Sequence, residues 1–500
     1  MDIKKGKLNV CVAIAFKIIT MIMSIVLKMV LIAICGNEVN GLNALYISII
    51  GVLSVAELGV GSAITYCMYK PIVENDHAIV AALYHLFQKL YLLIGAIIFL
   101  AGVALTPFLP YFAKDYSQLD VNIYLTFLLV LISVTASYLF SAKISLINAY
   151  KNDYITTIIT YSSVVFQYVL QITVLYATRS FVCYLLCRIA AVFVQGVATE
   201  WVARKNYGVI LKIHSKLDTT TKKKVWKNVK AMFMHKIGNV LVNTVDSIVI
   251  SAFVGVVSLG EFSNYTLILS SMTGIITLIF TSLTSVIGHF CEEENKQVVQ
   301  KYCESFHLLN FVIGTFFFLG YYAVIDDLIA MLFSLELVVS KNISFVITLN
   351  GFIQFMRHGI MTFKDATGTF YADRWKPLFE GITNIILSIC MVKIMGVVGV
   401  LVATIITNLL ICHIVEPYAL YKNVFGVIPT RYCAKNYGMI MAFGIMLIIE
   451  SAVMMTKTSP FVEMVLNGMI SILCSLVLCG MIFLLDKKNF KLLVNIAKKG

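Results

Sequence analysis

Long runs of apolar residues, separated by short polar breaks, extend along the whole chain. Each run is about 20 residues or longer, which is the length of α-helix that crosses roughly 30 Å of hydrocarbon. The alternating segments of about ten residues that mark a membrane β-barrel do not occur. Because backbone groups in hydrocarbon must pair within the chain, the pattern predicts an all-α membrane protein.

The polar breaks divide the chain into about fourteen spans. An even number of spans places both termini on one side of the membrane. The predicted bounds are 10–34, 41–68, 88–111, 121–146, 154–177, 180–203, 236–257, 261–288, 305–325, 342–363, 377–397, 399–421, 436–456 and 461–485.

An internal repeat organises these spans. A shift of 219 residues without gaps gives nine identities in 34 positions, including Gly41 on Gly260 and Tyr46 on Tyr265. Repeats in which both halves begin on the same side are a common construction in transporters. The sequence therefore predicts two pseudo-symmetric six-helix lobes, an N-terminal one at 1–203 and a C-terminal one at 236–421. A basic cytoplasmic linker at 204–235 connects them, and two additional helices with a basic cytoplasmic tail follow at 422–500.

Composition and charge agree with this picture. With 60% hydrophobic and 13% charged residues, the chain is not an ordinary soluble enzyme. Of its 39 Lys and Arg residues, 31 fall on the side of the termini, which the positive-inside rule makes cytoplasmic. The net charge of +13 thus follows from topology, and we expect no nucleic-acid partner. The sequence also lacks a P-loop, an HExxH motif and a nucleophile elbow, and no cysteine spacing suggests a metal site, so we expect a non-enzyme.

The first span carries a polar stripe. Lys17, Thr20, Ser24 and Lys28 lie at i, i+3, i+7 and i+11, so they share one face of a helix. Polar groups inside a membrane usually face a partner or a wet cavity. The alternative is that the two lysines extend toward opposite membrane surfaces.

The seventh span repeats this stripe with Lys236, Asn239, Asn243 and Asp246. Under the shift of 219 residues, Asn239 and Asn243 fall on Thr20 and Ser24. Two related stripes are what a cavity between two lobes would need. The alternative is hydrogen bonding that only holds helices together.

Other ionisable groups within the spans are also candidates. Arg188 is the deepest cation, and it either lines a cavity or pairs with a buried acid. Glu57, Glu380 and Glu416 have either a structural ion pair or a role in ion coupling. Arg357 ends the tenth span and is expected at the cytoplasmic interface.

Short motifs in both halves resemble bacterial polysaccharide biosynthesis (O-antigen-type) flippases, which belong to the multidrug/oligosaccharidyl-lipid/polysaccharide (MOP) exporter superfamily. The motifs are GLNALY at 41–46, AELGVGSAI at 56–64, YKPIVEND at 69–76, HKIG at 235–238, DSIVIS at 246–251 and GEFSNY at 260–265.

The resemblance implies a two-lobed bundle in the bacterial cytoplasmic membrane. It would move an undecaprenyl-pyrophosphate-linked oligosaccharide from the inner to the outer leaflet by alternating access, for cell-surface polysaccharide assembly. It further implies H⁺ or Na⁺ as candidate coupling ion, no other cofactor, and membrane lipids, a polysaccharide polymerase and glycosyltransferases as partners.

The polar residues fit an anionic substrate. A pyrophosphate in a low-dielectric core needs counter-charges, so the predicted substrate-binding residues are Lys17, Lys28, Arg188, Lys236, Asn239 and Asn243. The candidates for ion coupling are Glu57, Asp246 and Glu380. The main alternative is a cation-coupled multidrug or organic-cation antiporter of the same superfamily, which would be expected to carry an acid early in the first span. A membrane scaffold without transport activity is a further alternative.

Overall fold

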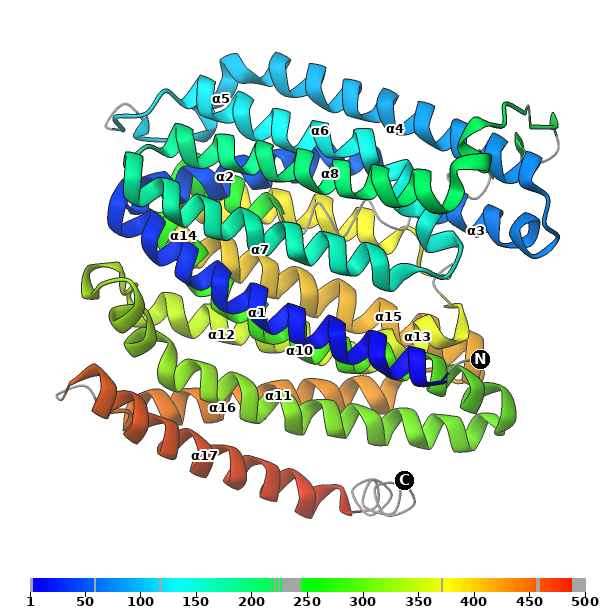
Figure 1. Ribbon diagram of the computed structural model, residues 1–500. Helices are drawn as coiled ribbons and strands as arrows, with labels where there is room; N and C mark the ends of the chain where they lie inside the picture. Colours follow the sequence, from blue (N-terminus) through cyan, green and yellow to red (C-terminus); the bar gives the residue numbers. More distant parts are fainter. Residues whose placement is uncertain are drawn as a thin grey trace. The chain divides into compact units, whose positions relative to one another are not determined.

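The computed structural model describes residues 3–57, 60–116, 119–215, 217–219, 222–223, 225–226, 244–369, 372–455 and 459–487, and all regular elements in these ranges are helical. Ten of the helices described there are long and apolar enough to cross a membrane (Figure 1). The predicted all-α membrane fold is therefore confirmed.

The chain divides into two compact units, Met1–Gly260 and Glu261–Gly500. In the first unit, α6 packs against α4 and α8, α7 packs against α8, and α1 packs against α7. Its helices are α1 (Ile3–Cys35), α2 (Asn37–Leu53), the 3₁₀ turn η1 (Ser54–Glu57), α3 (Val60–Val73), α4 (His77–Leu105), the 3₁₀ turn η2 (Thr106–Phe108), α5 (Leu109–Phe112), α6 (Ile123–Ala149), α7 (Asp153–Thr178), α8 (Phe181–Lys212) and the short helix Thr244–Phe253.

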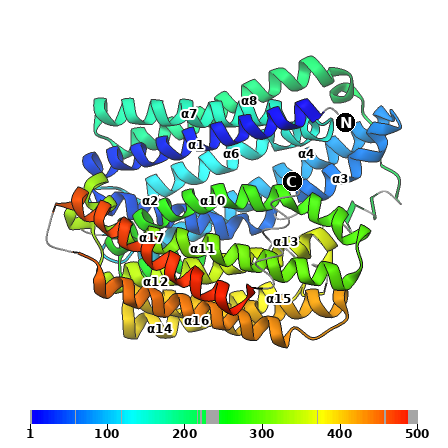
Figure 2. The same cartoon turned by 90° about the horizontal axis from the view of Figure 1, so that it is seen from below.

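In the second unit, α11 packs against α12, α16 and α17, and Figure 2 shows α17, in red, beside α11 and α16. The helix α10 (Val256–Glu293) starts in the first unit and continues into the second. The others are α11 (Lys296–Leu332), the 3₁₀ turn η4 (Leu335–Leu337), α12 (Lys341–Met356), α13 (His358–Thr367), α14 (Lys376–Thr407), the π-helical η6 (Asn408–Cys412), α15 (His413–Leu420), the π-helical η7 (Tyr421–Phe425), α16 (Thr430–Val453) and α17 (Pro460–Leu485).

The fourteen predicted spans correspond to these helices. Only ten of the described helices are long enough to span a membrane, because some predicted spans are divided between shorter helices and two others join into one segment. Span 41–68 is divided between α2, η1 and α3, and span 342–363 between α12 and α13. Only Thr244–Phe253 represents span 236–257, because its first part lies outside the described residues. The lobe and linker bounds stay predictions.

Spans 377–397 and 399–421 form one interrupted helical segment, Lys376–Phe425. The interruption is Gly396, whose φ of 57° lies in the left-handed region that glycine adopts without a steric penalty. The predicted break between the two spans therefore falls where the backbone leaves the helical conformation.

The repeat has a structural counterpart in two buried tyrosines, Tyr46 and Tyr265, which are both 0% exposed. The hydroxyl of Tyr46, on α2, donates to the carbonyl of Ile123 at the start of α6, at 2.8 Å. The hydroxyl of Tyr265, on α10, accepts from the amide of Val339 just before α12, at 3.2 Å, and donates to Asp326 at 2.7 Å. In each unit a tyrosine thus connects an early helix to the start of a later one.

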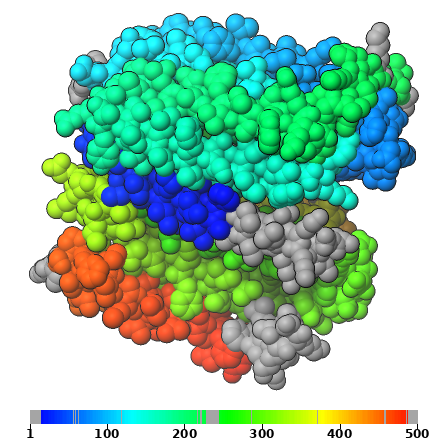
Figure 3. Space-filling model, viewed as in Figure 1, coloured from blue at the N-terminus to red at the C-terminus, as the bar shows by residue number. Residues whose placement is uncertain are grey.

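The helices α7 and α8 present an exposed face, in green in Figure 3, and large apolar side chains on both helices are exposed. Val169, Val197 and Trp201 are 51%, 66% and 63% exposed. Many exposed large apolar side chains are unusual on a protein in water but are expected where lipid is the solvent.

Candidate functional site

The polar stripe of α1 is partly satisfied within its own helix. The hydroxyl of Thr20 donates to the carbonyl of Lys17 at 3.0 Å, and that of Ser24 donates to Met21 at 2.7 Å. Hydroxyls that bond back to the preceding turn need no partner on another helix. Lys17 and Lys28, which are both half-buried, are therefore the chemically distinctive members of the stripe.

Arg188 lies half-buried on α8, as Lys28 does on α1. Cys35, at the end of α1, is close enough to Tyr184 of α8 to interact with it electrostatically. Lys28 precedes Cys35 by seven residues and Arg188 follows Tyr184 by four, which are rises of about 10 and 6 Å along the two helices. Because α1 and α8 cross the membrane in opposite directions, both cations lie on the same side of this contact.

Glu57 accepts hydrogen bonds from two tyrosines rather than from a cation. The hydroxyls of Tyr91 on α4 and Tyr138 on α6 donate to its carboxylate oxygens at 3.3 and 2.7 Å. Both tyrosines are nearly buried, at 4% and 5% exposure. The carboxyl of η1 therefore connects three elements of the first unit.

The second polar stripe is placed only in part. Lys236, Asn239 and Asn243 lie outside the described residues. Asp246 is half-buried on the helix Thr244–Phe253. The predicted relation between the two stripes therefore stays a prediction.

Glu380 belongs to a buried cluster of four charges in the second unit. Arg357 donates to both carboxylate oxygens of Glu416, at 3.1 and 2.6 Å, and to the amide oxygen of Asn408 at 2.8 Å. Lys376 lies 2.6 Å from Glu416 and 2.7 Å from Glu380, and Arg357 lies 3.4 Å from Glu380. Two cations and two anions thus compensate each other.

Two of the three acids whose roles were left open, Glu380 and Glu416, form ion pairs in this cluster. The side chains of Glu380 and Glu416 are 3% and 2% exposed, so their charges require partners. Arg357, which ends the tenth predicted span, pairs with both of them, and its side chain is 16% exposed. Its expected position at the cytoplasmic interface stays a prediction. The sequence contained one indication that these residues could meet. Spans ten and twelve end, and span eleven begins, on the same predicted side of the membrane.

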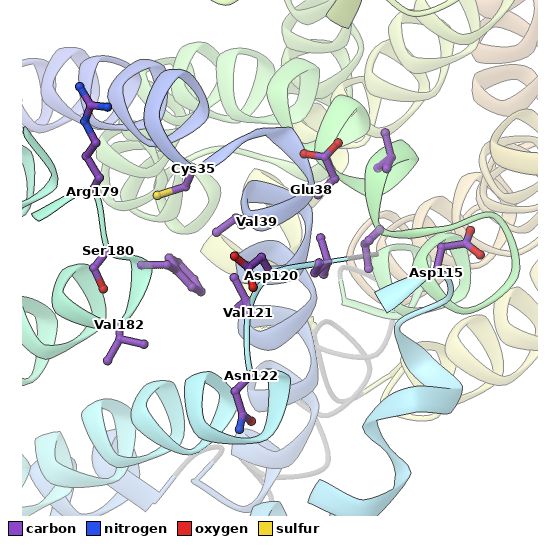
Figure 4. Close-up of a pocket in the computed structure, with 14 residues that line it drawn as sticks. Cys35, Glu38, Val39, Asp115, Asp120, Val121, Asn122, Arg179, Ser180 and Val182 are labelled. Carbon is purple, nitrogen blue, oxygen red and sulfur yellow. The ribbon is translucent and has the colours of Figure 1, made fainter. Parts of the chain in front are cut away.

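A cavity of about 520 Å³ opens in the first unit at the end of α1 (Figure 4). Its lining comes from the end of α1, the start of α2, the segment before α6, the start of α8 and the start of α10. The charged residues among the lining are Glu38, Asp115, Asp120 and Arg179. The first predicted span ends on the outer side, so this cavity lies on the predicted outer side. Of the predicted substrate-binding residues, the three that the structure describes, Lys17, Lys28 and Arg188, do not line it.

No family model matches the sequence, and no curated protein matches it. Solved structures do match the fold. An inward closed conformation of the lipid II flippase MurJ superposes with a TM-score of 0.63 at 14% identity, over 95% of this chain and 99% of that one. An inward-facing multidrug resistance MATE transporter of the MOP superfamily also gives 0.63, at 12% identity, over 87% and 98% of the two chains.

A MOP superfamily transporter from Pyrococcus furiosus, described as having a binding pocket of reverse polarity, gives a TM-score of 0.54 at 12% identity, over 89% of this chain and 97% of that one. At these identities the similarity shows the fold alone. The chain therefore has the fold of MOP superfamily transporters.

Proposed function

We propose, from this transporter fold, that the protein moves an undecaprenyl-pyrophosphate-linked oligosaccharide from the inner to the outer leaflet by alternating access. It would act in the cytoplasmic membrane of a bacterium, with both termini cytoplasmic, and supply the assembly of a surface polysaccharide. A polysaccharide polymerase and glycosyltransferases would be its partners.

The observation that supports an anionic substrate is the charge of the membrane helices in the first unit. The helix α1 carries Lys17 and Lys28 and contains no acid. Arg188 adds a third cation on α8. A pyrophosphate that crosses the bilayer loses its hydration, and cations at membrane depth offset part of this cost.

Ion coupling is proposed at Glu57 and Asp246, with H⁺ or Na⁺ as the ion. The third candidate, Glu380, is already compensated by Lys376 at 2.7 Å and Arg357 at 3.4 Å. A carboxylate held by two cations offers little net attraction for a third, so we give Glu380 a structural role.

The test is transport in proteoliposomes that contain a fluorescent undecaprenyl-pyrophosphate oligosaccharide, with the leaflet read by a membrane-impermeant sugar-modifying reagent. We expect Lys28→Ala to slow translocation by about tenfold or more, because a lost counter-charge worth about 1.4 kcal/mol changes a rate tenfold. The matched control is Lys89→Ala, which removes an exposed lysine from α4 and should leave the rate unchanged. Normal translocation by Lys28→Ala would remove this residue from the proposed site.

Organic-cation antiport is the second candidate function, because the MATE transporter superposes as well as the flippase does, with a TM-score of 0.63 for both. The same proteoliposomes separate the two when a fluorescent organic cation is offered under an imposed proton or sodium gradient. Gradient-driven uptake of the cation without translocation of the lipid-linked sugar would replace the proposed function by antiport.

A further inference from the structure

Glu450 is a fully buried carboxyl in the last turn of α16. Its side chain is 0% exposed, and the donor within reach of its carboxyl is the neutral hydroxyl of Ser471 on α17. None of the ion pairs formed between described residues includes it. This isolation contrasts with Glu380 and Glu416, which are equally buried but compensated by cations.

The groups that face Glu450 are neutral. From α17 these are the hydroxyl of Ser471, which is the adjacent polar group, and the thiol of Cys474. From α11 it is the phenol of Tyr322. The contact of α12 with α16 is apolar, since Phe352 stacks on Phe443 with ring centroids 3.6 Å apart. No element packed against Glu450 thus brings a cation to it within the described part of the unit.

These surroundings favour one ligand. A carboxylate without a counter-charge is costly inside a membrane helix bundle, whereas a neutral carboxylic acid is tolerated. Metal cations bind through several oxygen ligands at once and prefer charged ones, whereas the described neighbours of the carboxyl are the neutral hydroxyls of Ser471 and Tyr322. A proton needs only one lone pair of a carboxylate oxygen, so it is the ligand that this carboxyl can bind.

Access differs between the two ends of α16. Toward its start, the helix is packed in an apolar cluster that includes Phe443, Met446 and Leu447. Toward its end, the side-chain amide of Asn467 on α17 makes two hydrogen bonds with the backbone of Met455. Its oxygen accepts from the Met455 amide at 2.9 Å, and its nitrogen donates to the Met455 carbonyl at 3.2 Å. That polar contact lies about one helical turn beyond Glu450 and at the predicted outer side, so water can reach the carboxyl most easily there.

We infer that the carboxyl of Glu450 binds and releases one proton. It exchanges this proton with water at the C-terminal end of α16, where Asn467 contacts the backbone. The bound form is the carboxylic acid. On release, the proton passes to water and the carboxylate remains between α11, α16 and α17. Glu450 itself follows the two predicted six-helix lobes in the sequence, and the inference holds whether or not the proposed substrate is correct.

Infrared difference spectroscopy on the full chain in lipid nanodiscs tests this inference without any substrate. We expect the carbonyl band of a protonated buried carboxyl in neutral buffer, its shift in D₂O, and its loss in strongly alkaline buffer. Glu450→Gln should abolish the band, whereas Glu336→Gln, which alters an exposed acid, should leave it intact. A band that persists in Glu450→Gln, or one that neither exchanges in D₂O nor responds to alkali, would overturn the site.

Two further variants guard against misfolding and test the route. Glu450→Asp keeps a carboxyl and should retain a shifted band even if the amide variant folds poorly. Asn467→Ala opens the polar contact at the end of α16 and should make deuterium exchange of the band several-fold faster. An unchanged exchange rate in Asn467→Ala would contradict access from this end.

Discussion

At the scale of single residues, the protein handles buried charge in two ways. Arg357, Lys376, Glu380 and Glu416 form a cluster with no net charge, and three hydrogen bonds fix the guanidinium to Glu416 and Asn408. Glu450 has no such partner among the described residues, which is why we assign it a proton. The same residue type therefore has a structural role at one position and a chemical role at another.

The cluster gives a stability prediction. Glu416→Gln leaves Arg357 and Lys376 with half of their compensation, and breaking a buried pair typically costs about 3–5 kcal/mol. We expect a clear drop in the midpoint of thermal unfolding of the purified protein in detergent. Glu336→Gln, at an exposed position, is the control and should leave the midpoint in place. An unchanged midpoint in Glu416→Gln would show that the cluster does not stabilise the second unit.

The tyrosine pair around Glu57 gives another prediction at this scale. Tyr138→Phe removes the 2.7 Å hydrogen bond to the carboxylate and leaves Tyr91 as the remaining donor. A buried acceptor that loses its donor costs about 1–3 kcal/mol, so thermal unfolding should occur at a lower temperature. Tyr111→Phe removes a hydroxyl from a side chain that is 77% exposed and serves as the control. Equal stability of the two variants would argue against a role of Glu57 in connecting helices.

At the scale of elements, the start of α2 packs directly on the start of α10, inside the first unit. A Cβ at Gly41 would lie 1.9 Å from the carbonyl oxygen of Val256, and one at Gly260 would lie 2.5 Å from that of Asn37. The side-chain amides of Asn37 and Asn40 donate to carbonyls of α10 across this contact, at 3.1 and 3.2 Å. Backbones can approach this closely only where both helices carry glycine.

Gly41→Ala is therefore expected to separate the two helices or to prevent folding. Overpacking usually costs about 1–3 kcal/mol, and a clash with backbone belongs at the upper end of that range. The matched control is Gly468→Ala on α17, where a Cβ meets nothing within 4 Å and alanine is the better helix former. Thermal unfolding and the yield of monodisperse protein would compare the two. A Gly41→Ala variant as stable as the control would contradict the close approach.

At the scale of the whole molecule, orientation is the property that the charge distribution predicts. With 31 of 39 cations on one side, the positive-inside rule places both termini in the cytoplasm and the segment before α12 outside. A reporter that is active only outside the cytoplasm should be active when fused after residue 340 and silent when fused after residue 428. The reverse pattern would invert the topology and, with it, the predicted outer access to Glu450.

The sequence by itself determined the helical membrane fold and the approximate position of the spans that lie in the described ranges. The reason is physical: hydrocarbon forces each segment to satisfy its own backbone, so length and hydropathy suffice to find it. It also predicted a break between spans 377–397 and 399–421, which lies close to Gly396, and the correspondence of Tyr46 with Tyr265, because both depend on features read along one chain.

Only the tertiary structure decided which polar groups meet. The contact of Arg357 with Glu416 spans 59 residues and that of Tyr138 with Glu57 spans 81. Such contacts depend on how each helix is rotated about its axis and which neighbour it faces, and in a uniformly apolar span the sequence hardly specifies either. For the same reason the isolation of Glu450 became evident only when α11, α16 and α17 were seen packed around it.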